Sequence, residues 1–329
     1  MSERLELTLV RKLEIAHSSG SVPAVVEHAS PYQWANACHE LWEAGRLDIV
    51  EYSARYLHSI YPELTYLSTL VGLFDEVPRH LPELLSFRDD PSVEIQVVRR
   101  SDCDAVLLCF CARKGTLGLP LNFVHEWLGR LPVNLIYIKD FSELYGTRGY
   151  SSLGRDMRSC VAALRRLAGD IGGKRIYTLG VSHSGGYAAL CYGLAVGAES
   201  VLSLAGATEL PRDFNERLKS ASLFDSVEGI RKNAGDLREL YYGMERKPRV
   251  LFAFSEEHST DRQQAERMAG LPNVELIPVS HYSQHNVVHP LIRQGRFLTL
   301  LFRLLSATAL STASGQPRHR DGIAVSLRP

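Results

Sequence analysis

The chain has 329 residues, and its 37 lysines and arginines are balanced by 37 aspartates and glutamates. This balance argues against the long-range attraction by which basic proteins bind nucleic acid or anionic lipid, so we expect neither as a partner. Hydrophobic residues make up 45% of the chain, an ordinary share for a packed globule. Charged residues interrupt positions 1–20, and the apolar stretch 297–310 is too short to cross a bilayer. We therefore expect a soluble cytoplasmic protein.

Two helices are predicted near the N-terminus. Residues 31–45 have the pattern of a helix closed by a glycine, and residues 48–60 that of a second helix. Together they resemble a single tetratricopeptide-type hairpin, and a single unit of that kind cannot bury its own apolar face. We expect the hairpin to pack on residues 63–74 and on the rest of the chain or a second chain. Residues 1–88 are assigned to this helical domain, which could also bind a protein partner.

Two apolar runs predict buried strands. The run 104–111 is continuously apolar after Asp104 and is bounded by charges, which is typical of a strand covered on both faces. Residues 135–138 form a second such run, and Asp140 follows it. Ligand sites in open parallel sheets gather at the carboxyl ends of the strands. Asp140 is therefore a candidate substrate contact, although an aspartate that braces its own loop would produce the same pattern.

The segment 175–190 carries the strongest functional signal. An apolar strand runs into a turn of small residues and then into a helix, which is the pattern of a nucleophile elbow. Gly180 and Ser184 stand two residues before and after Ser182 and are small enough to let strand and helix nearly touch. Ser184 followed by Gly186 fits a second register, in which Ser184 is the nucleophile. Ser182 is the preferred nucleophile, because a glycine stands at the tighter upstream position, Gly180. A glycine-rich turn with serines that only cap the helix would also fit.

The residues after the turn strengthen the functional interpretation. Tyr192-Gly193 and the strand-like Gly197-Ala198-Glu199-Ser200-Val201-Leu202 come next, and residues 92–305 as a whole resemble the α/β-hydrolase superfamily. The narrower resemblance is to bacterial hydrolases with Gly-x-Ser-x-Gly-Gly-Tyr-x-Ala-Leu. It implies an α/β fold with a mostly parallel sheet and helices on both faces over residues 89–306. A helical cap insert is expected at about 206–246.

This chain departs from that pattern by one residue, because His183-Ser184 stands where the family has one residue before Gly-Gly. Aligned from the Gly-Gly side, His183 would take the nucleophile position, and the site would be inactive. The resemblance also implies that Asp140 and Tyr145 belong to an Asp-x-x-x-x-Tyr feature near the substrate. Residues 307–329 lack periodicity, and we expect them to be disordered.

A serine nucleophile needs a base, and the base needs an acid. In this fold the acid follows a later strand and the histidine lies near the C-terminus. After the apolar run 248–254, a helix is predicted over 262–269. Asp261, just ahead of it, is the preferred acid, Glu257 is the alternative, and a helix N-cap role would also explain Asp261. His285 is the preferred base on the resemblance, with His281 as the alternative.

The histidine spacing does not predict a metal site. His281, His285 and His289 follow one another at intervals of four residues. However, His281 is predicted to lie in a loop, and no glutamate or cysteine completes a ligand set. We therefore predict no metal. The six cysteines contain no Cys-x-x-Cys pair and sit mostly in apolar runs, which is typical of reduced core thiols. Acyl chemistry through a serine needs no cofactor, and none is expected.

An oxyanion needs two N–H donors. The first is expected from His183, the residue after the preferred nucleophile, and the resemblance implies a second from Cys111 or Ala112. The sequence thus predicts a serine hydrolase or acyl transferase that acts on a small-molecule ester or thioester. The other hypothesis is an inactive hydrolase fold that binds a glycan or protein partner. Within the cap, Phe224, Tyr241 and Tyr242 could line an acyl pocket.

Overall fold

The computed structural model describes residues 2–20, 29–81, 83–101, 103–210 and 236–306. Three sequence predictions fall outside these ranges: the disordered tail at 307–329, most of the cap insert and the pocket residue Phe224.

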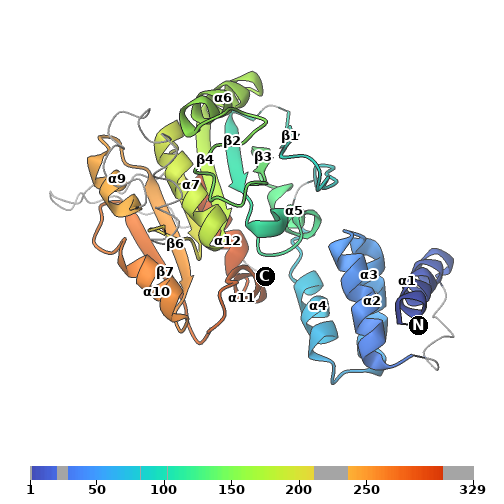
Figure 1. Cartoon of the computed structure of the whole chain (residues 1–329). Helices are drawn as coiled ribbons and strands as arrows, with labels where there is room; N and C mark the ends of the chain where they lie inside the picture. Colours follow the sequence, from blue (N-terminus) through green and yellow to red (C-terminus); the bar gives the residue numbers. More distant parts are fainter. Residues whose placement is uncertain (1, 21–28, 82, 102, 211–235, 307–329) are drawn as a thin grey trace, which may run out of the picture.

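A seven-stranded sheet forms the centre of the molecule (Figure 1). Its strand order is β1-β3-β2-β4-β5-β6-β7. β1 pairs antiparallel with β3, and all other neighbours are parallel. The strands are β1 (Ile95–Val98), β2 (Ala105–Phe110), β3 (Asn134–Ile138), β4 (Arg175–Val181), β5 (Ser200–Leu204), β6 (Arg249–Ser255) and β7 (Val274–Val279). The predicted α/β class with a mostly parallel sheet is confirmed.

Helices cover both faces of the sheet and form a separate group at the N-terminus (Figure 1). The N-terminal helices are α1 (Ser2–Ser19), α2 (Pro31–Glu43), α3 (Leu47–Ile60) and α4 (Thr65–Asp75). The others are the short 3₁₀ helix η2 (Arg113–Gly115), α5 (Leu121–Leu128), α6 (Met157–Asp170), α7 (Ser182–Val196), α9 (Leu237–Gly243), α10 (Ser259–Glu266), α11 (Val288–Arg293) and α12 (Arg296–Leu305). Both helices predicted within 31–60 are present as α2 and α3.

The strand period of two divides the buried side chains into two cores. In β2, Val106, Leu108 and Phe110 face a core shared with α6 and α7. Leu107 and Cys109 face the opposite core, shared with α5, α11 and α12. All six residues of β2 are buried, as expected for a strand covered on both faces. The sheet is therefore the middle of three layers, and the carboxyl ends of its parallel strands share one edge.

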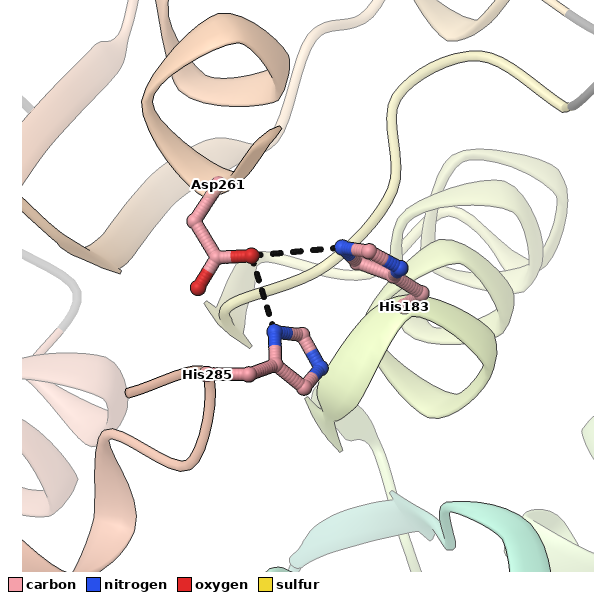
Figure 2. Close-up of side chains that lie close together, drawn as sticks. All are labelled: His183, Asp261 and His285. Carbon is pink, nitrogen blue, oxygen red and sulfur yellow. Dashed lines mark hydrogen bonds and ion pairs between the residues drawn. The ribbon is translucent and has the colours of Figure 1, made fainter. Parts of the chain in front are cut away.

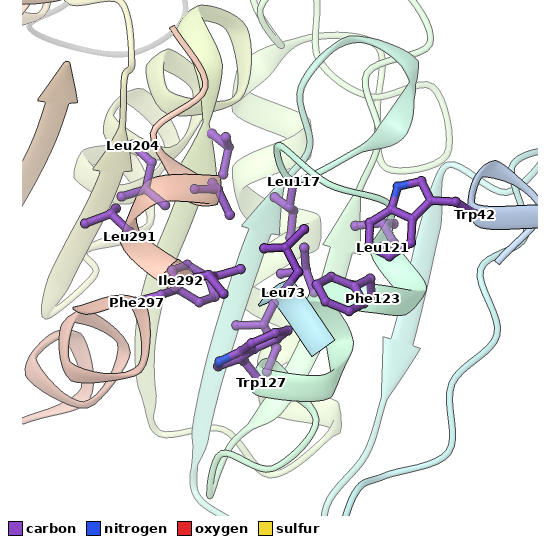
Figure 3. Close-up of a cluster of buried hydrophobic side chains, with 14 of the residues drawn as sticks. Trp42, Leu73, Leu117, Leu121, Phe123, Trp127, Leu204, Leu291, Ile292 and Phe297 are labelled. Carbon is purple, nitrogen blue, oxygen red and sulfur yellow. The ribbon is translucent and has the colours of Figure 1, made fainter. Parts of the chain in front are cut away.

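The N-terminal helices pack on the second of these cores. A capping box between Ser30 and Gln33 begins α2. The rings of Trp42 and Phe123 lie 4.6 Å apart (Figure 3). Those of Phe74 and Phe123 lie 5.2 Å apart. The hairpin therefore packs between α1 and α4, and Trp42 extends this apolar core to α5. Because this apolar core is continuous, the boundary at residue 88 and the tetratricopeptide resemblance remain predictions.

A buried histidine joins α5 to the sheet and to the segment before β1. His125 is 2% exposed, and its Nδ1 lies 2.7 Å from the Tyr137 hydroxyl. Its Nε2 lies 2.7 Å from the Leu85 carbonyl oxygen, so Nε2 carries the proton and Nδ1 accepts from the tyrosine. Burial lowers the pKa of His125 to about 4. The imidazole is therefore held neutral as a structural link.

Within the range predicted for the cap insert, the structure describes the helix α9. Tyr241 is fully buried, and its hydroxyl donates to the Pro248 carbonyl oxygen at 3.1 Å, so it fills the core and lines no acyl pocket. Tyr242 is 54% exposed. Among the described helices, none has both the length and the apolarity needed to cross a membrane.

Candidate active site

Ser182 is the first residue of α7 and lies in the strained turn where β4 ends. Its φ is +63°, a left-handed conformation that costs energy for a residue with a side chain and is often found at functional positions. A Cβ on Gly180 would lie 2.0 Å from the Gly185 carbonyl oxygen, and a Cβ on Gly185 would lie 2.5 Å from that of Phe110. Strand, helix and the neighbouring strand can approach this closely only because both positions are glycine. The turn has the geometry of a nucleophile elbow centred on Ser182.

Ser184 stands on the first turn of α7 and is 8% exposed. Within the described residues its hydroxyl makes no hydrogen bond to a histidine. The structure thus distinguishes the two registers by conformation: residue 182 is the strained one, and residues 183 and 184 are helical.

A hydrogen-bonded chain links Ser182 to two residues from distant parts of the sequence. The Ser182 Oγ lies 2.8 Å from Nε2 of His285, in the segment between β7 and α11. The other ring nitrogen, Nδ1, lies 2.8 Å from Oδ1 of Asp261 (Figure 2). The carboxylate can only accept, so Nδ1 carries the proton and Nε2 is free to accept from the serine hydroxyl. The three preferred site residues are thus brought together in the order that proton transfer requires.

Asp261 is fully buried on the first turn of α10. It is not the N-cap, which corrects one interpretation of the sequence. The helix begins at Ser259, before the predicted Arg262, and His258 is the N-cap, with the Asp261 N–H donating to its Nδ1 at 3.3 Å. Burial raises the pKa of Asp261, but hydrogen bonds from His183 and His285 lower it, and the net shift is downward. The carboxylate is therefore ionised at neutral pH.

Two further imidazoles contact the same carboxylate oxygen. Nε2 of His183 lies 3.2 Å from Oδ1 of Asp261, and Nδ1 of His258 lies 3.1 Å from it (Figure 2 shows His183). Neither side-chain contact was predicted from the sequence, in which His183 was expected to contribute its backbone N–H to the oxyanion. No local signal could have found the His183 contact, because the two residues lie 78 positions apart.

The alternative acid and base lie elsewhere. His281 is 97% exposed, and its Nδ1 is 3.9 Å from Oε1 of Glu257. Neither side chain is hydrogen-bonded to Ser182 within the described residues. His285 is instead held by its neighbour, because Nδ2 of Asn286 donates to the Gly118 carbonyl oxygen at 2.5 Å and ties this loop to the one after β2.

The two N–H groups expected as the second oxyanion donor already make backbone hydrogen bonds. The Cys111 N–H donates to the Ile138 carbonyl oxygen at 2.9 Å, and the Ala112 N–H donates to that of Thr116 at 2.7 Å. In this conformation neither N–H is free to bind an oxyanion, and the second donor implied by the resemblance stays a prediction. The His183 N–H is the second of α7, where the first N–H groups have no partner within the helix. It remains the better placed donor.

Asp140 braces its own loop. Its Oδ1 accepts from the Ser142 N–H at 3.0 Å, and its Oδ2 accepts from the Gly146 N–H at 2.8 Å. Tyr145 has a φ of +60°, and its ring lies 6.0 Å from that of Tyr187 on α7. The loop interpretation of Asp140 therefore has direct support from these contacts, and the contact with substrate stays a prediction.

The structure gathers possible metal ligands where the sequence predicted none. His183, Asp261 and His285 each offer a ligand atom, and these atoms lie within 4.8 Å of one another. The histidines spaced four apart do not form such a group: His281 is exposed, and His289 lies on α11. The cysteines that the structure describes are all free, and burial raises the pKa of Cys111 to about 12, so its thiol stays protonated.

No family model matches the chain, and no curated protein matches its sequence. Solved structures do resemble it. A lipase-esterase related protein from Clostridium acetobutylicum is 14% identical, with a TM-score of 0.40, over 64% of this chain and 100% of that one. MenH from S. aureus is 13% identical, with a TM-score of 0.40, over 64% of this chain and 97% of that one. The enol-lactonase from Burkholderia xenovorans is 13% identical, with a TM-score of 0.40, over 64% and 95%.

Likenesses this distant say nothing about activity. The fold is instead identified from features of this chain. It has a parallel sheet with one antiparallel edge strand, and a strained serine where β4 ends and α7 begins. The chain has the α/β-hydrolase fold. Within that fold, the carboxyl ends of β4, β6 and β7 lead into the segments that carry Ser182, Asp261 and His285.

Proposed function

We propose that this chain is a serine hydrolase that cleaves a small-molecule ester or thioester through an acyl-enzyme. The observation that carries the proposal is the unbroken hydrogen-bonded chain from Ser182 through His285 to Asp261, with both links at 2.8 Å. A serine hydroxyl is a weak nucleophile unless a base takes its proton as it attacks. This arrangement supplies the base and fixes its tautomer.

In the proposed reaction, the Ser182 Oγ attacks the carbonyl carbon while its proton passes to Nε2 of His285. Asp261 holds the ring by Nδ1 and stabilises the imidazolium that forms. The imidazolium then gives its proton to the leaving alcohol or thiol. Water, or another acceptor in an acyl transfer, repeats the sequence on the acyl-enzyme, and Ser182 regains its proton.

The developing oxyanion has one preorganised donor, the His183 N–H at the start of α7, where the helix dipole also favours negative charge. Ala112 could donate only if its 2.7 Å hydrogen bond to Thr116 opened. We therefore propose that a substrate carbonyl displaces the Thr116 oxygen as it binds. Each such donor contributes on the order of 10² to 10³ in kcat in comparable hydrolases.

The test is hydrolysis of p-nitrophenyl acetate and of an acetyl thioester by the chelator-treated protein. Ser182→Ala should lower kcat by a factor on the order of 10⁴ to 10⁶. Ser184→Ala is the matched control, since it removes a hydroxyl two residues away on the same helix, and it should leave the rate close to that of the unmodified protein.

Equal rates for the unmodified protein and Ser182→Ala would contradict the proposal. If the folded protein hydrolyses neither ester nor thioester, the hypothesis of a binding module for a glycan or protein partner becomes the better one. Loss of activity in Ser184→Ala alone would move the nucleophile to the other register.

A further inference from the structure

The surroundings of Asp261 exceed what a serine hydrolase needs. One carboxylate oxygen, Oδ1, has three imidazole nitrogens within 3.2 Å: Nδ1 of His285 at 2.8 Å, Nδ1 of His258 at 3.1 Å and Nε2 of His183 at 3.2 Å. Orienting the base requires only the first of these.

The three rings do not contact this oxygen in the same way. His285 needs its proton on Nδ1, and His183 needs its proton on Nε2, because a carboxylate only accepts. Nδ1 of His258 lies 3.3 Å from the Asp261 nitrogen and 3.1 Å from Oδ1, so a neutral ring either accepts from the Asp261 N–H or donates to Oδ1, but not both. His183 and His285 are therefore the two rings that point a nitrogen at Oδ1 without a competing contact to the same nitrogen.

We propose that His183, Asp261 and His285 form a binding site for a divalent transition metal of the zinc type, and that occupation of this site switches the hydrolase off. One ligand atom from each residue already lies within 4.8 Å of the other two. Two imidazole nitrogens and a carboxylate oxygen are ligands that Zn²⁺ takes at about 2.0 to 2.2 Å. Small side-chain rotations toward a common centre bring them to those distances. A fourth position stays open to water or to His258.

Burial and charge favour a cation there. Asp261 is fully buried and its pKa is lowered, so it presents a carboxylate at neutral pH. The rings of His183 and His285 are each about 30% exposed, which leaves a path for an ion from solvent. Their centroids lie 4.3 Å apart at 62°, so the rings approach the carboxylate from different directions (Figure 2). The N-terminal end of α7 opposes a cation, and the carboxylate offsets this.

Metal binding would inhibit through the tautomer of His285. In the hydrolase, Nδ1 carries the proton and Nε2 accepts from Ser182. A metal on Nδ1 moves the proton of the neutral ring to Nε2, which then donates and can no longer accept the serine proton. The ion also takes the carboxylate that would stabilise an imidazolium. Binding by itself does not depend on the proposed hydrolysis, whereas the inhibition does.

The experiment uses the full chain freed of metal by a chelator. Co²⁺ is titrated in and followed by visible absorption, and Zn²⁺ affinity is measured by competition with a chromophoric chelator. The unmodified protein should bind one ion per chain. His183→Gln should weaken binding at least about tenfold, since removal of even an outer partner of a metal site costs about 10 to 100-fold. His281→Gln, which removes an exposed histidine from the same region, should bind like the unmodified protein.

Activity supplies the second readout, with the metal-free rate of each variant as its own reference. Zn²⁺ should inhibit ester hydrolysis by the unmodified protein and EDTA should restore it, while His183→Gln should need at least about tenfold more Zn²⁺ for half inhibition. Histidine-ring NMR of the unmodified protein provides a measurement that needs no variant: Zn²⁺ should shift the ring signals of His183 and His285.

Three results would overturn the inference: no Co²⁺ binding by the unmodified protein, equal affinities for it and His183→Gln, or unchanged ring signals of His183 and His285. Failure of the proposed function is a separate result, because it would appear as absence of hydrolysis in EDTA, before any metal is added.

Discussion

Two histidine networks in this molecule use similar hydrogen bonds for different ends. His125 bonds to the Tyr137 hydroxyl and a backbone carbonyl, and it is 2% exposed. His285 bonds to the Ser182 hydroxyl and the Asp261 carboxylate, and it is 30% exposed. Both rings contact a hydroxyl and an oxygen acceptor at 2.7 to 2.8 Å. Hydrogen bonding alone therefore does not identify a functional histidine.

The differences lie in what each ring can do with a proton. His125 has a neutral acceptor and a tyrosine donor, and burial lowers its pKa to about 4, so it stays neutral and joins layers of the fold. His285 has an ionised carboxylate on one side to stabilise positive charge and a serine in a strained turn on the other. Exposure, a carboxylate partner and a strained hydroxyl together are the features on which we propose a base role for His285 and a structural role for His125.

The largest effect that separates the two networks should come from the base itself. His285→Gln keeps a polar side chain but removes the group that accepts the serine proton. We expect kcat for ester hydrolysis to fall by a factor on the order of 10⁴ to 10⁶ with little change in thermal stability. Steady-state kinetics and a melting curve measure this, and a drop of less than tenfold would contradict the role of His285.

Asp261→Asn should come next. The amide no longer requires the proton of His285 to sit on Nδ1, so the tautomer that accepts from Ser182 loses its support. A fall in kcat on the order of 10⁴ is expected. Asp236→Asn is the control, because it alters another partly buried carboxylate, paired with Arg267, away from the site. Similar rate losses in both variants would point to general destabilisation rather than to the relay.

His125→Gln should change stability and leave the chemistry alone. The folded state keeps His125 neutral to about pH 4, whereas the unfolded chain protonates it near pH 6.5. The unfolded state thus binds more protons between these values, and stability falls as pH drops through that window. The loss amounts to about 3 kcal/mol for the unmodified protein, and it should be absent from the variant.

Urea unfolding at several pH values between about 7 and 4 measures this difference. Because other groups titrate in the same range, the quantity to compare is the free energy of unfolding of the unmodified protein minus that of the variant. A difference that does not change with pH would show that His125 is not held neutral. A large loss of kcat in the folded variant would break the distinction between the two networks.

The smallest effect should come from Asn286→Ala. The Asn286 side chain joins the His285 loop to the Gly118 carbonyl oxygen and accepts from the Val288 N–H at 3.2 Å. Its loss leaves His285 in place but less well fixed. We expect kcat to fall about tenfold with KM nearly unchanged, since modest misplacement of a catalytic group costs up to about 10²-fold. A rise in KM with unchanged kcat would instead assign Asn286 to substrate binding.

The sequence predicted features set by local pattern or chain order. The turn at Ser182 is local, because small residues within five positions permit it. The fold's chain order located Asp261 and His285 after the correct strands. The predicted start of α10 was wrong because Ser259 and Asp261 are both good N-cap residues, whereas the observed N-cap, His258, is an unusual one.

Features that depend on contacts between residues far apart in the sequence could not be predicted. Whether the Ala112 N–H is free depends on how the turn to Thr116 closes, and the apolar pattern of β2 carries no information on that. The His183 contact with Asp261 depends on the packing of α7 against α10. The same applies to His125, whose role follows from the approach of Leu85 and Tyr137 and not from its neighbours in sequence.

The central claim is that the Ser182 hydroxyl is an activated nucleophile, and covalent trapping tests it most directly. The metal-free protein is treated with a fluorophosphonate, digested, and the modified residue is located by peptide mass spectrometry. We expect one adduct per chain, on Ser182, that forms rapidly in the unmodified protein and much more slowly in His285→Gln. A folded protein that stays unlabelled, or one labelled at Ser184, would contradict it.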